Sequence, residues 1–344
     1  MKFETTVLRD FRNLGSAGFE WGPGINFLCG PNGAGKTNLL ESLNVLSGWG
    51  PFSGRIGGLT AWDSRTGRAL LAARVSGESS HDFKVRISTR MTLAADEKHI
   101  TCTELRLLLP SLTFLPADIN LVDGSPSVRR LFLDKLCALC LAPYARRRAE
   151  FHQISRHRAA LLRQGRPVRG TTLPFARLGG WIMEARRSVA AHLLSLSHLA
   201  CPSTIPFTFS LRPALSGSGE DCLLAALEEH AERERHALRP LVGPGRDDLE
   251  ILSLDRPASA SLSRGQKRRL VLSLILMAAR LVETRLRRSP VLIFDDLTAE
   301  LDADGRAAAG RALADTGWQV FISGTEDPFP EVKKTLLNMP EIKA

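Results

Sequence analysis

The chain has 344 residues, of which 44% are hydrophobic and 24% are charged, and its formal net charge is +10. These values are typical of a globular protein with one large or two ordinary domains. The sequence has no apolar run of membrane-span length and no signal-type N-terminus, so a cytoplasmic protein is favoured over a membrane or secreted one.

The first part of the chain, up to about residue 116, is predicted to be rich in strands, such as the alternating segment 83–88. Its most informative segment is the octapeptide GPNGAGKT at 30–37, which fits the phosphate-binding pattern G-x-x-x-x-G-K-[ST]. A buried strand is predicted at 25–29, and a helix is predicted to begin at Thr37. A glycine-rich loop between such elements turns backbone amides and a helix N-terminus toward anionic oxygens.

The octapeptide therefore predicts a site for a nucleoside triphosphate. Lys36 would reach the β- and γ-phosphates, and the Thr37 hydroxyl would ligate Mg²⁺. Cys29 stands directly before the loop, and the sequence assigns it no role. The residues expected to surround the phosphates are Gly30, Pro31, Asn32, Gly33, Ala34, Gly35, Lys36 and Thr37.

The middle of the chain is predicted to be helical, with helices up to Pro143, from 144 to 162 and from 175 to 198. Between Pro126 and Ala200, 14 Lys and Arg residues stand against three acidic residues, so this block carries +11 and the rest of the chain −1. Nucleic acid is the expected partner of such a block, and a solvated arginine-rich surface is the alternative. The candidate DNA-binding residues are Arg129, Arg130, Arg146, Arg147 and Arg148.

Two features of this helical block keep a structural interpretation beside the functional one. Arg129 and Arg130 either contact DNA or anchor the block through carboxylates such as Asp134. Cys137 and Cys140 form a lone C-x-x-C in an apolar helix, which favours buried thiols over a metal site.

Strand-like segments return at 207–211, 291–294 and 320–323. The apolar run at 291–294 ends in Asp295 and Asp296, the layout of a Walker B strand beside the strand of the phosphate-binding loop. Asp295 would hold Mg²⁺ through water, and Asp296 would act as the general base on the attacking water. Together with Lys36 they are the predicted catalytic residues.

The segment SLSRGQ at 261–266 resembles the Leu-Ser-Gly-Gly-Gln signature of the ATP-binding-cassette (ABC) ATPases, with Arg264 in place of the first Gly. The helix N-terminus that bears Ser263, Gly265 and Gln266 would contact a γ-phosphate held by the other subunit. The resemblance thus implies a head-to-tail dimer with two shared ATP sites. The segment 299–302 resembles the ABC D-loop, in which Glu300 and Asp302 are expected to shape the dimer contact.

Several ordered motifs resemble the RecF family of bacterial recombination mediators over nearly the whole chain. They are FRN at 11–13, KTNLLE at 36–41, a P-x-D…G-x-P-x-x-R-R-x-F-x-D block at 116–134, and GPGRDDL at 243–249. The chain departs from the family pattern at Ala159, Gly245 and Arg264, and Leu115-Pro116 stands where a Q-loop glutamine is usual.

The resemblance implies an α/β fold: an ABC-type P-loop ATPase head, similar to RecF and SMC heads, formed by residues 1–125 and 201–344, with a basic α-helical arm inserted at 126–200. It implies a slow, DNA-stimulated ATPase that uses ATP and Mg²⁺, forms a homodimer on ATP binding and binds double-stranded DNA near single-strand gaps. It also implies support of RecA loading in recombinational repair and the SOS response, with RecR as partner and RecO as a second candidate. The alternative is an ATP-gated DNA-binding or interaction module with negligible hydrolysis, which Arg264 and the absent glutamine favour.

Overall fold

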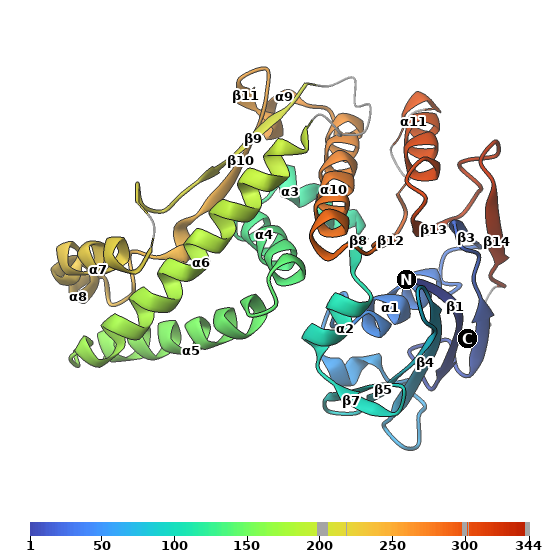
Figure 1. Ribbon diagram of the computed structural model, residues 1–344, viewed down its shortest axis with the longest axis horizontal. Coiled ribbons are helices and arrows are strands. Elements are labelled where there is room, and N and C mark those ends of the chain that lie inside the picture. The colour runs from blue at the N-terminus through green and yellow to red at the C-terminus, as the bar shows by residue number, and fades with distance from the viewer. Residues whose placement is uncertain (198–205, 218, 298–300, 302, 341–344) are drawn as a thin grey trace. The chain divides into compact units, whose positions relative to one another are not determined.

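The computed structural model describes residues 1–197, 206–217, 219–297, 301 and 303–340. The chain forms two compact units, each built from segments distant in the sequence (Figure 1). Unit 1 comprises Met1–Asp118 and Ser263–Ala344, and unit 2 comprises Ile119–Leu199 and Ile205–Leu262. Among the described helices, none combines the length and the apolar character that crossing a membrane requires.

One sheet of unit 1 is antiparallel, with strand order β2-β1-β4-β5-β6-β7. Its strands alternate between buried and exposed positions because only one face is covered, as at Phe83, Val85 and Ile87. The strand predicted at 83–88 is confirmed. The strands are β1 (Lys2–Arg9), β2 (Ala17–Glu20), β4 (Ala69–Ser76), β5 (His81–Ile87), β6 (Met91–Ala95) and β7 (Lys98–Ile100).

The second sheet of unit 1 is parallel, with strand order β14-β3-β13-β12-β8. Every residue of β12 and β13 is buried, as expected for strands covered on both faces. The strands are β3 (Ile25–Cys29), β8 (Ser111–Phe114), β12 (Val291–Phe294), β13 (Gln319–Gly324) and β14 (Lys334–Asn338). Three of them confirm the strands predicted at 25–29, 291–294 and 320–323.

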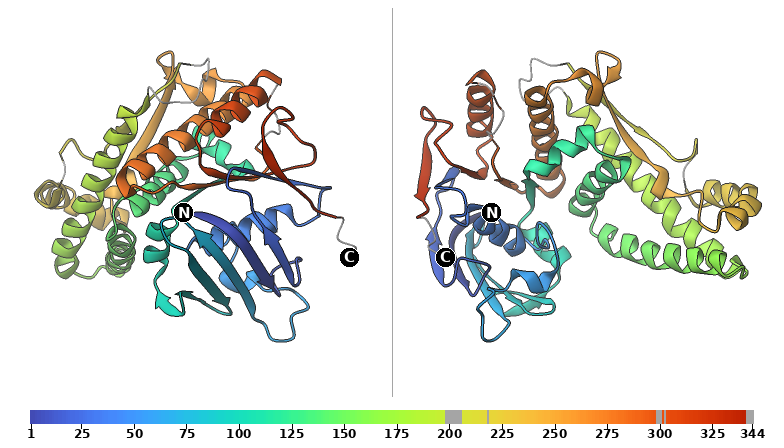
Figure 2. Two further views of the ribbon diagram at one scale, coloured as in Figure 1. Left: turned by 45° about the vertical axis from the view of Figure 1, so that its right-hand side comes forward. Right: turned by 180° about the vertical axis from the view of Figure 1, so that it is seen from behind.

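Helix α1 (Lys36–Leu46) is the centre of the unit 1 core. Residues 39–46 are buried around the whole helix, because α1 contacts strands of both sheets, β4 and β5 as well as β12 and β13. Figure 2 shows α1 beside the antiparallel strands. The other helices of unit 1 are α2 (Cys102–Leu108), α10 (Arg264–Leu286) and α11 (Ala303–Ala314), with short 3₁₀ turns at Ile56–Leu59 and Pro116–Ile119.

Unit 2 contains three long helices, α4 (Pro126–Cys140), α5 (Tyr144–Arg163) and α6 (Arg169–Ser195). They confirm the three predicted helices, although α6 begins six residues earlier than predicted and has Pro174 inside it. Cys137 is a buried free thiol whose pKa is raised by burial, in keeping with a packing role. The remaining elements are α3 (Asn120–Asp123), α7 (Gly219–Glu229), α8 (Ala231–Ala237), α9 (Ala258–Ser261), a 3₁₀ turn at Pro244–Arg246, and the sheet of β9 (Thr208–Arg212), β10 (Asp248–Ser253) and β11 (Arg256–Pro257).

The boundary between the units differs from the sequence-based one, which assigned 201–344 to the ATPase head. Residues 205–262 belong instead with the helical block, and their carboxylates neutralise several of its arginines. Arg129 pairs with Asp248 at 2.7 Å, Arg158 with Glu234 at 2.7 Å and Arg186 with Asp247 at 2.9 Å. Residues 119–199 contain 14 basic and four acidic residues, and residues 205–262 contain six basic and ten acidic residues. The formal charge of unit 2 is therefore +6, whereas the predicted arm at 126–200 alone carries +11.

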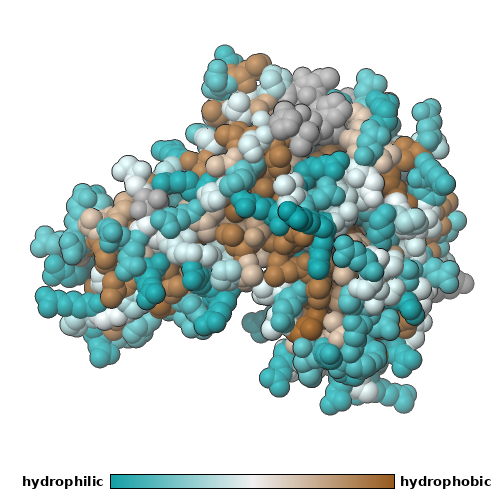
Figure 3. Space-filling view, viewed as in Figure 1, coloured by the Kyte–Doolittle hydropathy of each residue, from teal (hydrophilic) through white to brown (hydrophobic). Residues whose placement is uncertain are grey.

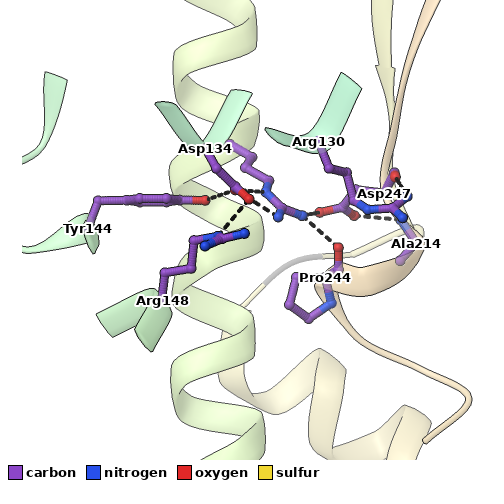
Figure 4. Close-up of polar contacts among 8 residues, drawn as sticks. Arg130, Asp134, Tyr144, Arg148, Ala214, Pro244 and Asp247 are labelled. Atoms are coloured by element: carbon purple, nitrogen blue, oxygen red, sulfur yellow. Dashed lines mark hydrogen bonds and ion pairs between the residues drawn. The ribbon is translucent and has the colours of Figure 1, made fainter. Parts of the chain in front are cut away.

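Arg186 is the centre of the buried polar network in unit 2, drawn in Figure 4. It donates to Asp134 Oδ1 at 2.8 and 2.9 Å, to Asp247 Oδ2 at 2.9 Å and to the Pro244 carbonyl at 2.6 Å. Asp134 also accepts from the Tyr144 hydroxyl at 2.5 Å and from Arg148 Nε at 2.6 Å. The network joins α4, α5 and α6 to the loop before β10.

We predict that Glu234→Ala lowers the free energy of unfolding by about 3–5 kcal/mol, because it leaves a buried guanidinium without its counter-charge. Glu234 is fully buried and accepts from Arg158 Nε and Nη2 and from the Leu241 N–H. The matched control is Glu232→Ala on the same helix, where the side chain is 85% exposed and a change within about 0.5 kcal/mol is expected. Urea unfolding followed by circular dichroism measures both, and equal stability of the two variants would contradict the prediction.

Candidate nucleotide-binding site

A cavity of about 1180 Å³ lies in unit 1 at the carboxyl ends of the parallel strands. The register pairs Phe294 with Ile322 and Ser323 with Leu28, so the residues that follow β3, β12 and β13 meet at one edge of the sheet. The cavity is lined by five of the eight predicted loop residues and by both predicted acids, namely Asn32, Gly33, Gly35, Lys36, Thr37, Asp295 and Asp296.

The phosphate-binding loop has the backbone that its glycines allow. Gly33 and Gly35 lie in the left-handed region, with φ of +83° and +82°, and Gly35 is the N-cap of α1. The Lys36 ammonium donates to the carbonyls of Gly30 and Pro31 at 2.7 and 2.8 Å. The lysine charge is therefore held within the curve of the loop, where an anion would bind.

A short chain of hydrogen bonds connects the loop to the two acids. The Thr37 hydroxyl donates to the Asp295 carboxylate at 3.0 Å, and the Ser323 hydroxyl donates to Asp295 Oδ1 at 2.6 Å. Ser323 also accepts from the Asp296 N–H at 3.0 Å. Hydroxyl and carboxylate oxygens are the donors that Mg²⁺ prefers, so Thr37 and Asp295 fit the predicted metal site.

Asp296 is held in a left-handed backbone conformation, with φ of +50°. Its N–H is bound by Ser323, and its carbonyl accepts from Arg268 Nη1 at 3.2 Å. Among the described residues, no side chain is hydrogen-bonded to its carboxylate. Asp296 also lines the cavity, where its carboxylate can act as a proton acceptor.

The strand order corrects one expectation from the sequence. The Walker B strand β12 is not beside β3, because β13 lies between them. This arrangement explains Ser323, which the sequence analysis missed: it stands near the end of β13 and bridges the two acids. A serine in a buried apolar strand was the only local signal for it.

Asn13 and Pro116 are among the lining residues that were not predicted as site residues. Asn13 accepts from Asn38 Nδ2 at 2.7 Å, and a Cβ added to Gly35 would lie 3.0 Å from the Asn13 side chain. Its neighbour Arg12 forms an ion pair with Glu41 at 2.8 Å and so attaches the turn after β1 to α1. Pro116 also lines the cavity, at the position where the family pattern has its glutamine.

The ABC-like signature forms the N-terminus of α10. Ser263 is the N-cap, its hydroxyl accepts from the Gln266 N–H at 3.3 Å, and Gln266 Oε1 accepts from the Ser263 N–H at 2.8 Å. This reciprocal capping box was readable from Ser-x-x-Gln. Ser263, Gly265 and Gln266 do not line the cavity described above. Glu300 and Asp302 lie outside the described residues.

Each candidate DNA-binding arginine has a partner within unit 2. Arg129 and Arg130 contact Asp248 and the Asp247 carbonyl rather than Asp134, while Arg148 contacts Asp134. Arg147 lies over the Trp181 ring at 4.3 Å. Arg146 pairs with Glu150 but is 85% exposed. On the face in Figure 3, hydrophilic residues gather over α5 and α8.

We predict that Gly35→Ala weakens binding of Mg²⁺ and ATP more than Gly33→Ala does, by up to roughly tenfold. Both positions are left-handed, so alanine costs roughly 1–2 kcal/mol at either one. Only at Gly35 would the added Cβ also collide, at 2.7 Å from Leu14, whereas nothing lies within 4 Å at Gly33. Isothermal titration calorimetry measures both affinities, and equal losses would show that loop sterics do not decide binding.

Comparison with known proteins identifies the family of the chain. The model of the RecF/RecN/SMC N terminal domain matches residues 2–342. The DNA replication and repair protein RecF of Teredinibacter turnerae is 30% identical over 337 residues, covering 93% of this chain and 87% of the relative. That of Rhizobium leguminosarum bv. trifolii is 32% identical over 341 residues, covering 93% and 91%.

Solved structures show the same fold. The structure of the recombination mediator protein RecF-ATPrS in the RecFOR pathway matches with a TM-score of 0.88 at 21% identity, covering 98% of this chain and 95% of that one. An Smc head bound to the C-winged helix domain of ScpA matches with a TM-score of 0.56 at 15% identity, covering 95% and 91%. The chain belongs to the RecF family, within the proteins that share the RecF/RecN/SMC N-terminal domain.

Proposed function

We propose that this chain is a DNA replication and repair protein of the RecF type that binds ATP and hydrolyses it slowly, with stimulation by DNA. The observation that carries the proposal is the convergence of Thr37, Asp295 and Ser323 at the end of three parallel strands. The relatives named DNA replication and repair protein RecF support the biological role, and the RecF structures with ATP and ATPrS support the nucleotide.

Different residues of the cavity bind the phosphates, bind the metal ion and accept the proton. The loop amides and Lys36 would hold the β- and γ-phosphates, and Thr37 and, through water, Asp295 would hold Mg²⁺. Bound Mg²⁺ offsets negative charge on the phosphate oxygens. Asp296 accepts a proton from the water that attacks the γ-phosphorus, while the bond to the bridging oxygen breaks and ADP and phosphate form.

A second copy of the chain completes the site. Ser263 and the first turn of α10 do not line the cavity of their own chain, yet the N-terminus of a helix suits an anion. In a head-to-tail homodimer each α10 terminus contacts the γ-phosphate held by the other copy. ATP binding then closes the dimer, and hydrolysis reopens it.

Double-stranded DNA near single-strand gaps is the proposed nucleic-acid partner. Unit 2 carries +6, and Arg146 exposes most of its side chain, which suits contacts to phosphates without sequence preference and with strong salt dependence. Membership of the RecF family supports RecR as the proposed protein partner and RecO as a second one. The proposed outcome is RecA loading in recombinational repair and the SOS response.

We predict that ATP turnover is slow and rises when duplex or gapped DNA is added. Lys36→Ala removes phosphate binding and Asp296→Asn removes the general base, so each lowers turnover by roughly a hundredfold or more. The control is Asp63→Asn, an exposed aspartate that does not line the cavity, which should retain wild-type turnover. Turnover of the wild type and of the three variants is measured as the rate of phosphate release at saturating ATP.

Two other outcomes would each change the proposal. ATP binding and ATP-driven dimerisation without turnover would identify an ATP-gated module, for which Pro116 in the cavity lining is the structural argument. Turnover that survives Lys36→Ala and Asp296→Asn would place hydrolysis elsewhere and contradict the assigned site.

A further inference from the structure

Unit 2 contains a second cavity, of about 450 Å³, that the nucleotide site does not include. It is enclosed by α4, α5 and α6 and by the loop at 240–246. Helical spacing brings its polar lining together, since Ser127, Arg130 and Asp134 follow one face of α4, and Arg148, His152 and Ser155 follow one face of α5. Its volume is within the range of small-molecule sites.

Cations dominate the lining of this cavity. It contains Arg130, Arg148, Arg186 and Arg246 against a single carboxylate, Asp134. Arg186 is neutralised by Asp134 and Asp247, and Arg148 shares Asp134 with it (Figure 4). These two carboxylates cannot balance the other two guanidinium groups as well.

Arg130 and Arg246 are the two cations that lack a carboxylate of their own. The Arg130 guanidinium donates to the backbone carbonyl of Asp247 at 2.8 Å, which is a neutral acceptor. Among the described residues, no side chain or carbonyl pairs with the Arg246 guanidinium. Arg246 is exposed and ends the 3₁₀ turn Pro244–Arg246 at the cavity wall. Both are placed to accept an external anion.

The electrostatic environment agrees with this charge count. Burial lowers the pKa of Arg130 and the neighbouring Arg186 lowers it further, while Asp248, Asp247 and Asp134 act in the opposite direction. Burial also lowers the pKa of His152, with added repulsion from Arg148 and Arg156. Burial is the largest cause for both groups, and the neighbouring arginines add a repulsion that an anion in the cavity would offset.

We propose that this cavity binds a phosphate oxyanion, carried either by a free phosphorylated small molecule or by a nucleic-acid strand. Planar guanidinium groups match the geometry of phosphate oxygens, and Ser127 and Ser155 add hydroxyl donors at the wall. The apolar wall of Leu131, Phe151, Ile182 and Val242 leaves room for the group that carries the phosphate.

The first test titrates sodium phosphate into the full chain carrying Lys36→Ala, which weakens phosphate binding at the loop. Ionic strength is held constant with chloride. Saturable binding is expected, and Arg246→Ala should weaken it about tenfold, as expected for loss of a charge-assisted hydrogen bond. Arg246→Lys should retain part of the affinity. Arg239→Ala is the matched control, since Arg239 is exposed, directly precedes this loop and does not line the cavity.

The second test identifies what carries the phosphate. Binding of a duplex oligonucleotide is measured for the same variants, with and without competing phosphate. Duplex binding weakened by Arg246→Ala, and displaced by phosphate, identifies a nucleic-acid strand. Unchanged duplex binding beside weakened phosphate binding identifies a free phosphorylated small molecule.

Arg246→Ala behaving like Arg239→Ala in both titrations would overturn the proposal. Neither titration requires ATP hydrolysis. Failure of the phosphate-binding proposal is therefore distinguishable from failure of the proposed ATPase function.

Discussion

The hydrogen bond between the Thr37 hydroxyl and the Asp295 carboxylate joins residues 258 positions apart. It exists because β3, β13 and β12 are parallel neighbours whose carboxyl ends meet at one edge. The buried helix α1 fixes the position of Thr37, since both sheets of unit 1 pack around it. The nucleotide site therefore depends on the same packing that stabilises the core, and Ser323 completes the connection from β13.

Unit 2 depends on a different principle, the neutralisation of buried arginines by acids from a later segment. Arg158, Arg186 and Arg129 are each paired with a carboxylate from residues 205–262. Removal of one partner leaves a charge in a low-dielectric interior, which is why such pairs specify how the segments assemble. The positive charge that no carboxylate neutralises, above all that of Arg246, is then available for the proposed binding of phosphate.

Much of the nucleotide site was predictable because its signals are local. The loop at 30–37 is one continuous octapeptide between a strand and a helix, and Asp295 and Asp296 directly follow an apolar run. Ser323 was not predictable in the same way, because its role arises only from the order of β3, β13 and β12. A single serine in a buried strand forms no sequence motif from which its role could be predicted.

The division of the chain into units was predicted less well, for a related reason. The excess of arginine in 126–200 was real, but the acids that balance it lie about 60 to 120 positions away, as with Arg186 and Asp247 or Arg129 and Asp248. Net charge along a sequence cannot show such pairing, so the acids of residues 205–262 were not assigned to the helical block. The capping box of Ser263 and Gln266, in contrast, is a local signal that the sequence does carry.

The central claim is that the loop of one copy and the α10 terminus of another form each ATP site. Mixing Lys36→Ala with Ser263→Asp tests it most directly, because aspartate preserves the helix cap while setting a carboxylate against the γ-phosphate. Ser263→Asn is the neutral control. Each variant alone should be inactive, and an equal mixture should regain about a quarter of wild-type turnover, since random pairing leaves one intact site in half of the dimers. A mixture no more active than its parts, or Ser263→Asp with full turnover, would contradict the shared site.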